Sequence, residues 1–255
     1  MTEILSIFSL YWLVILLFLF IAILYSSAGF GGGSSYLAIL ALTGLAYTEI
    51  RATSLLCNII VVTGGTYLFH QNKLIDWKKI LPLILVSMPM ALVGGWLKIS
   101  EGLFFVLLGV SLLLAAVLML IVKRNNSEQE IATQIHFKRN ILFGSSIGFL
   151  SGIVGIGGGI FLAPLLHLTN WGTSKKIAAT ASVFILFNSI FGLIGQGLND
   201  SFSINYALTS VLLISVFLGG QIGSRLSANL MSQIWVKRIT AVLIAFVGLR
   251  ILWNL

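Results

Sequence analysis

Residues 29–35 read GFGGGSS and residues 155–159 read GIGGG, inside a chain that is otherwise almost entirely apolar. Glycine weakens a helix because its backbone is conformationally free and carries no side chain to shield it from lipid. Irregular backbone at membrane depth is tolerated only where it packs inside protein or lines a polar cavity. The two runs begin 126 positions apart in similar surroundings. They therefore predict a pair of broken helices that serve one site.

The composition indicates an all-α polytopic membrane protein. Of the 255 residues, 58% are hydrophobic and 9% are charged, whereas a soluble domain carries roughly 25% charged residues. Crossing a bilayer as a helix takes about 20 apolar residues. About ten membrane segments can be drawn, at residues 4–25, 30–45, 52–69, 80–97, 103–122, 140–154, 158–170, 177–195, 205–223 and 235–253. The sixth and seventh are short, and a soluble globular fold is excluded.

The chain divides into two similar halves. We expect a first membrane repeat over residues 1–122, a cytoplasmic connecting loop over 123–139, and a second membrane repeat over 140–255. Several features recur in the same order in both halves: GFGGG and GIGGG, Ala52-Thr53-Ser54 and Ala179-Thr180-Ala181-Ser182, Gln71 and Gln196, and Gly94-Gly95 and Gly219-Gly220. An internal duplication explains this order.

The basic residues predict the orientation of the segments. With ten segments, the connections after the odd-numbered ones, together with their flanking helix ends, carry 12 Lys and Arg residues, against 3 on the other side. Cytoplasmic loops are the ones enriched in Lys and Arg, so both termini are expected outside. If segments 2 and 7 are not counted as crossings, the two sides carry 8 and 7 Lys and Arg residues, and the bias disappears. A re-entrant hairpin of segments 6 and 7 would leave the sidedness of the other loops unchanged. Five segments per half imply two inverted-topology repeats.

The glycine runs are also the candidate binding site. Short, glycine-interrupted segments at matching points of two halves are the best sequence pointer to a transporter site. A helix that starts after either run exposes unpaired N–H groups with a partial positive charge, and glycine lets an anion approach them closely. The alternative is close helix packing through small residues. The candidate substrate-binding residues here are Gly31, Gly32, Gly33, Ser34, Ser35, Gly157, Gly158 and Gly159. Because serines follow only the first run, we expect the first break to hold substrate more tightly.

Other polar residues inside the segments are ambiguous. Asn58 and Asn188 either bond to another helix or contact substrate, and the residues alone favour neither role. Arg51 could attract an anion, although an interfacial arginine that extends toward water is commoner. No carboxylate falls centrally within a segment. That absence suits an anionic substrate and argues against a carboxylate proton relay.

Enzymatic and nucleic-acid-binding functions lack support in the sequence. The three histidines are far apart, and the GxSxG match at residues 144–148 lies inside an apolar segment rather than at a strand-to-helix elbow. We therefore predict no catalytic residue, no metal site and no cofactor. The net charge of +8 is explained by the basic connections between segments rather than by nucleic-acid binding. The single cysteine, Cys57, excludes an intrachain disulfide framework.

With these motifs, the chain resembles the TauE/SafE-type sulfite exporter family, also known as the toluene-sulfonate uptake permease family. The matching features are the GxGGG motif near the start of each half, the following Ala-Thr-Ser helix start, the later Gly-Gly pairs and the basic central loop. The resemblance implies secondary transport of sulfite, sulfonates or related sulfur-containing or organic anions across a bacterial cytoplasmic membrane. It also implies that Asn58 and Asn188 join the glycines as pathway residues.

The expected partners are therefore the small anion and the lipid bilayer. A coupling ion and assembly into a homo-oligomer are left open by the sequence. An anion channel built on the same helices is the alternative function.

Overall fold

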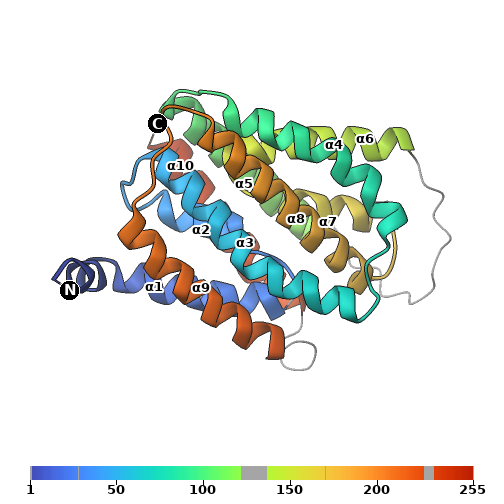
Figure 1. The fold of residues 1–255 in the computed structure, drawn as a ribbon, viewed down its shortest axis with the longest axis horizontal. Coiled ribbons are helices and arrows are strands. Elements are labelled where there is room, and N and C mark those ends of the chain that lie inside the picture. Colours follow the sequence, from blue (N-terminus) through green and yellow to red (C-terminus); the bar gives the residue numbers. More distant parts are fainter. Residues whose placement is uncertain (1, 28, 122–136, 170, 227–232, 255) are drawn as a thin grey trace.

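The computed structural model describes residues 2–27, 29–121, 137–169, 171–226 and 233–254, and this part of the chain folds into ten helices (Figure 1). Each helix overlaps one of the predicted segments. The helices are α1 (Thr2–Ser27), α2 (Gly33–Leu40), α3 (Tyr47–Gln71), α4 (Trp77–Trp96), α5 (Glu101–Ile121), α6 (Phe137–Val154), α7 (Gly159–Leu168), α8 (Ser174–Gly197), α9 (Tyr206–Leu226) and α10 (Gln233–Trp253). The predicted connecting loop at 123–139 lies mostly outside the described residues.

The helices differ in whether they can span a bilayer alone. Six stretches of the described chain are long and apolar enough to do so: Ser9–Ser27, Tyr47–Gln71, Trp77–Trp96, Glu101–Ile121, Ser174–Gly197 and Tyr206–Arg225. This makes the chain a multi-pass membrane protein. By contrast, α2 has 8 residues and α7 has 10. At 1.5 Å per residue, neither covers a hydrocarbon core of about 30 Å. The glycine run before each short helix supplies part of the remaining path.

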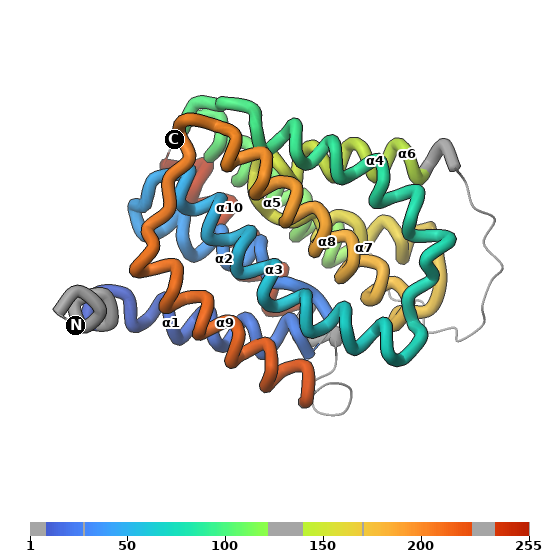
Figure 2. The backbone as a smooth tube through the Cα atoms, viewed as in Figure 1, coloured from blue at the N-terminus to red at the C-terminus, as the bar shows by residue number. Residues whose placement is uncertain are grey.

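Helix α1 lies beside α9, along the lower side of the molecule in Figure 2, and runs parallel to it. The Ser215 hydroxyl donates to the Ile15 carbonyl at 2.9 Å. One turn further on, Gly219 packs on α1 so closely that a Cβ there would lie 2.6 Å from the Leu19 carbonyl oxygen. Small residues allow this backbone-to-backbone approach between membrane helices.

Helix α6 lies beside α4 in the same way, along the upper side of Figure 2. Gly148 faces the backbone of Ser87, and Gly152 faces the backbone of Ala91. Both residue numbers increase together, so these two helices are also parallel. Here too, glycine permits direct contact between the two backbones.

The contacts between helices in one half of the chain are repeated by the equivalent helices of the other half, and we call this correspondence the exchange rule. When each helix is replaced by the fifth helix before or after it, the α1–α9 pair becomes the α6–α4 pair, and the α4–α8 pair becomes α9–α3. Likewise, α2–α10 becomes α7–α5, while α3–α8 and α5–α10 map onto themselves. The α3–α8 pair runs through the middle of the molecule (Figure 2). A duplicated chain produces this kind of packing.

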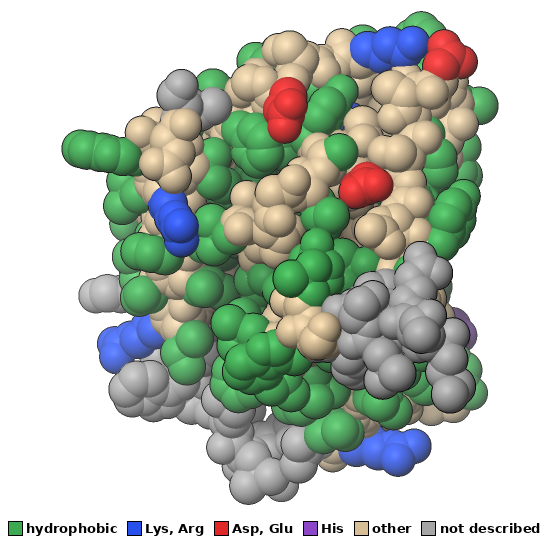
Figure 3. Space-filling model, turned by 90° about the vertical axis from the view of Figure 1, so that its left-hand side faces the viewer, with side chains coloured by type: hydrophobic (Ala, Val, Ile, Leu, Met, Phe, Trp, Pro, Cys, Tyr) green, Lys and Arg blue, Asp and Glu red, His purple; other side chains and the backbone are tan. Residues whose placement is uncertain are grey.

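The two ends of the bundle differ in charge. Both termini lie at the left-hand end of Figure 1, which we call the termini end. Figure 3 looks onto this end, where hydrophobic and uncharged side chains dominate the described surface. At the opposite end, which we call the basic end, α3 and α9 finish and α4 and α8 begin. The described basic residues of that end include Lys73, Lys78, Lys79, Lys175, Lys176, Arg225 and Arg238.

Candidate functional site

Each short helix starts from a glycine with left-handed backbone. Gly32 caps α2 with φ +92°, and Gly158 caps α7 with φ +82°. The carbonyl oxygen of each glycine accepts hydrogen bonds of 2.9–3.2 Å from the amides three and four residues later. Residues with a Cβ rarely adopt this backbone conformation. The predicted breaks are therefore real, and both glycine runs start a helix in the same way.

The two breaks meet at Asn58 in the middle of α3. The Asn58 Nδ2 group donates to the Ile156 carbonyl in the second break at 3.0 Å. A Cβ on Gly33, in the first break, would lie 2.6 Å from that same carbonyl oxygen. Added Cβ atoms on Gly31 and Gly157 would lie 2.6 and 2.7 Å from the Asn58 side chain. A Cβ on Gly33 would push directly against the second break, whereas one on Gly31 or Gly157 would displace the Asn58 side chain.

Unpaired amide groups gather around this meeting point. Among the described residues, the backbone N–H groups of residues 31–34 and 156–160 have no hydrogen-bond acceptor. They belong to the breaks and to the first turns of α2 and α7, where the helix dipole places a partial positive charge. Such helix N-termini are ready-made sites for anions. The arrangement can therefore bind a small anion through backbone groups.

The side chains at the meeting point are also incompletely bonded. The Oδ1 atom of Asn58 and the Oγ atom of Ser189 are buried without a partner in the described part of the chain. Ser189 lies close by, since a Cβ on Gly157 would come within 2.9 Å of its Oγ. Buried polar atoms are nearly always hydrogen-bonded in folded proteins. These two atoms mark a polar centre that a ligand or water can complete.

The serines of the first break have other partners. The Ser35 hydroxyl lies 2.8 Å from the Tyr25 hydroxyl of α1, and Ser34 interacts with the same tyrosine. The hydroxyl that reaches the break comes instead from α3, where Ser54 donates to the Gly33 carbonyl at 3.1 Å. Sequence reasoning did not single out Ser54 for this contact.

Asn188 makes its hydrogen bonds to groups outside the two breaks. Its Nδ2 group donates to the Ser87 hydroxyl at 3.1 Å and to the Phe184 carbonyl at 2.8 Å, so it links α8 to α4. The residue that corresponds to Asn58 is Ile185, because a Cβ on Gly159 would collide with Ile185 as one on Gly33 would collide with Asn58. The amide side chain at the meeting point is therefore contributed by the first half, and the second half contributes the Ser189 hydroxyl.

Arg51 is buried, contrary to the interfacial role that its sequence position suggested. Only 3% of its surface is exposed. Its Nη2 group donates to the Gly95 carbonyl at 3.3 Å and to the Gly152 carbonyl at 3.1 Å. The described residues supply no acidic side chain within ion-pair distance of it. The guanidinium reaches helix ends inside the bundle rather than the water outside it.

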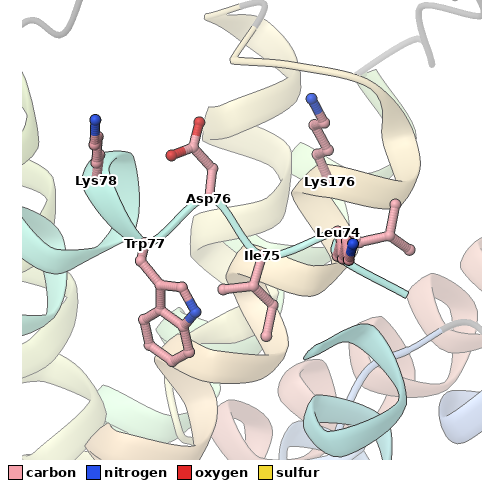
Figure 4. Close-up of a pocket in the computed structure, with 7 residues that line it drawn as sticks. Leu74, Ile75, Asp76, Trp77, Lys78 and Lys176 are labelled. Carbon is pink, nitrogen blue, oxygen red and sulfur yellow. The ribbon is translucent and has the colours of Figure 1, made fainter. Parts of the chain in front are cut away.

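A hollow of about 320 Å³ opens at the basic end (Figure 4). It lies where α4 and α8 begin, and Asp76 caps α4 by accepting from the Lys79 amide at 3.4 Å. Three lysines against one carboxylate make the hollow positively charged. Its lining residues are Lys73, Leu74, Ile75, Asp76, Trp77, Lys78 and Lys176. Such a surface attracts anions from solution.

The remaining sequence candidates occupy ordinary helix positions. Ser145 of the GxSxG match lies within α6 and donates to the Leu142 carbonyl of its own helix. Cys57 is a fully buried core residue. The described part of the chain holds no group of three His, Cys, Asp or Glu side chains placed to bind a metal ion.

Comparison with known proteins points to one family. The family model described as sulfite exporter TauE/SafE matches residues 14–251. The probable membrane transporter protein y4hK of Sinorhizobium fredii is 33% identical over 245 residues, covering 92% of this chain and 96% of the relative. Two Bacillus subtilis proteins with the same description are also similar. YjnA is 29% identical over 230 residues, covering 84% and 89% of the two chains, and YunE is 25% identical over 213, covering 75% and 77%. No solved structure matches the chain at a significant level.

Proposed function

Because the chain belongs to the TauE/SafE sulfite exporter family, we propose that it is a secondary transporter of small anions. The proposed substrates are sulfite, sulfonates or related sulfur-containing or organic anions, and the proposed location is the bacterial cytoplasmic membrane.

The observation that carries this proposal is the meeting of the two breaks at Asn58. The N-terminal turns of α2 and α7 present unpaired amides there, and Gly31, Gly33 and Gly157 bring the backbone of both breaks close to the Asn58 side chain. Half-helix N-termini near the bilayer midplane recognise anionic groups in other transporters. Asn58 lies 11 residues after the start of α3 and 13 before its end. The proposed substrate site is therefore near mid-depth.

We propose that the two halves are inverted repeats and that transport is by alternating access. The exchange rule of the helix pairs supports a duplication. The parallel pairs α1–α9 and α6–α4 support the inversion, because α1 runs toward the basic end and α6 runs away from it. Rocking of the two sets of helices about the meeting point would open it to one side of the membrane at a time.

The basic hollow would be the cytoplasmic mouth of this pathway. Its three lysines lie at the end that the positive-inside rule assigns to the cytoplasm, so both termini would face outside. Their charge would raise the local concentration of anions before binding.

Counterflow in proteoliposomes tests the proposal. Vesicles containing purified protein and unlabelled sulfite should accumulate labelled sulfite transiently, and the same should hold for at least one sulfonate. Uptake should fall at least tenfold in Asn58→Asp, because its carboxylate would repel the anion and lose the donor to Ile156. Asn72→Asp is the matched control, since Asn72 lies at the exposed end of the same helix.

Two outcomes would contradict the proposal. Conductance without saturation or counterflow would indicate a channel. Full sulfite uptake by Asn58→Asp would show that the meeting point of the breaks is not the substrate site.

A further inference from the structure

Arg51 is a buried cation whose partners do not use all of its donors. Its Nη2 group is bonded to the carbonyls of Gly95 and Gly152, but its Nε group is buried without an acceptor in the described part of the chain. A buried donor without a partner costs folding free energy, and so does a buried charge without a counter-ion. These two features together call for an additional, negatively charged partner.

A second unpaired donor belongs to the same junction of helices. Gln196, in the last turn of α8, is only 4% exposed, and its Nε2 group has no described acceptor. Gly95 links it to the arginine. The Gly95 carbonyl accepts from Arg51, and a Cβ on Gly95 would lie 3.2 Å from the backbone nitrogen of Gln196. The two residues that carry the unpaired donors therefore both lie against one glycine of α4.

The protein holds this cation without neutralising it. Gly95 and Gly152 lie in the last turns of α4 and α6, where the helix dipole favours a cation. The two helix ends thus stabilise the guanidinium through Nη2 alone and leave Nε unused. A carboxylate at this place would neutralise the guanidinium but would exclude an anion.

The junction is connected to the meeting point of the two breaks. A Cβ on Gly155 would lie 3.1 Å from the Arg51 Cα, and Gly157 lies against Asn58. The second break therefore runs along α3 from Arg51 to Asn58. Arg51 precedes Asn58 by seven residues, which is about 10 Å along a helix at 1.5 Å per residue.

We propose that Arg51 and Gln196 form a second anion subsite, on the termini side of the central site, for a small oxyanion or the sulfonate group of a larger anion. The inference rests on the proposed function of anion transport. In the second half, the position of Arg51 is taken by Ala178, which lies against Gly29 as Arg51 lies against Gly155. The subsite therefore exists on one side of the membrane only.

Substitutions that change the charge but keep the size test the subsite. Gln196→Glu introduces a carboxylate at the junction that holds the arginine and, if the two residues form one subsite, raises the melting temperature without ligand. It should also increase the sulfite concentration for half-maximal thermal stabilisation at least tenfold. Arg51→Lys should keep the positive charge and the fold. It should raise that concentration at least fivefold, because lysine has a single nitrogen and so has no second donor at the position of the arginine Nε. Gln71→Glu is the matched control, since Gln71 is exposed at the end of α3 and its side-chain amide donates to the Tyr67 hydroxyl of the same helix.

The measurements are thermal unfolding of the purified protein in a sodium sulfite series, with sodium gluconate at equal ionic strength, and sulfite uptake by proteoliposomes. A purely structural role predicts lower melting temperatures in the Arg51 and Gln196 variants, with the sulfite dependence and the uptake KM unchanged. That result would overturn the subsite while leaving the transporter proposal standing. A wild-type protein that neither transports any tested anion nor is stabilised by one would overturn both.

Discussion

Replacing Gly33 by alanine should separate the two breaks, and the equivalent change at Gly159 should not. At Gly33 the new Cβ would lie 2.6 Å from the Ile156 carbonyl oxygen, which is backbone and cannot rotate away. At Gly159 the new Cβ would collide with the terminal atoms of the Ile185 side chain, which can change rotamer. The two positions start α2 and α7 in the same way, so they form a matched pair.

The expected cost at Gly33 follows from the atoms involved. Inserting a methyl group into packed structure costs about 1–3 kcal/mol, and losing the Asn58–Ile156 hydrogen bond costs about 1–3 kcal/mol because buried groups are left unpaired. Alanine returns about 0.5–1 kcal/mol through its higher helix propensity. The net loss is about 1–5.5 kcal/mol, centred near 3 kcal/mol. For a chain of this size it corresponds to a fall in melting temperature of about 2–22 °C.

At Gly159 the terms nearly cancel. A displaced rotamer of Ile185 costs about 0.5–1.5 kcal/mol, and the propensity gain of about 0.5–1 kcal/mol offsets most of it. The melting temperature should stay within about 4 °C of the wild-type value. Gly102→Ala is the control for propensity alone, because no atom lies within 4 Å of a Cβ there.

Thermal unfolding followed by tryptophan fluorescence, together with sulfite uptake, measures these effects. Gly33→Ala should lower both stability and uptake, and Gly102→Ala should lower neither. Equal melting temperatures for Gly33→Ala and Gly159→Ala would refute the packing argument. Normal uptake by Gly33→Ala would show that contact between the breaks is unnecessary for transport.

Three further predictions concern other parts of the molecule. Tyr25→Phe or Ser35→Ala should lower the free energy of unfolding by about 0.5–1.5 kcal/mol, because each removes the 2.8 Å hydrogen bond between the two hydroxyls. Thermal unfolding of the double variant should show no loss of stability beyond that of Tyr25→Phe. Lys73→Gln combined with Lys78→Gln should slow sulfite uptake at low ionic strength, and the difference from wild type should shrink at about 1 M salt, where the Debye length is about 3 Å. An impermeant maleimide should label Lys98→Cys in intact cells and Lys78→Cys only after permeabilisation. The wild-type chain is the blank, because Cys57 is fully buried; labelling of both variants from outside would reject the proposed topology.

The helices were predictable from sequence because apolar runs and their polar interruptions directly reflect the bilayer. The predicted segments at 30–45 and 158–170 nevertheless extend beyond α2 and α7. Apolar residues continue past the end of α2, since Leu45 packs on the core without being helical. Hydropathy indicates which residues are buried, but it does not indicate where the helical hydrogen bonds end, so the predicted segments were too long.

The site was predictable only in part. The glycine runs were visible because three adjacent glycines have few structural explanations in a membrane segment. The partners of Asn58 were not, because its contact with Ile156 spans 98 positions of sequence. The family resemblance implied Asn188 as a pathway residue beside Asn58, but the residue of α8 that contacts the second break at the matching place is Ile185. The burial of Arg51 depends on where α4 and α6 end, which no local pattern encodes.

The pairing of α1 with α9 has a consequence for synthesis of the protein. Ile15 receives its hydrogen bond from Ser215, which lies 200 positions later. At about 5–20 residues per second, α1 waits roughly 10–40 s for this partner after its own translation. During that interval, the glycine-facing surface of α1 is open to lipid or to the insertion machinery. Assembly of the bundle is therefore a late event, and a ribosome that stalls before α9 leaves a membrane-inserted chain whose first helix is exposed to quality-control proteases.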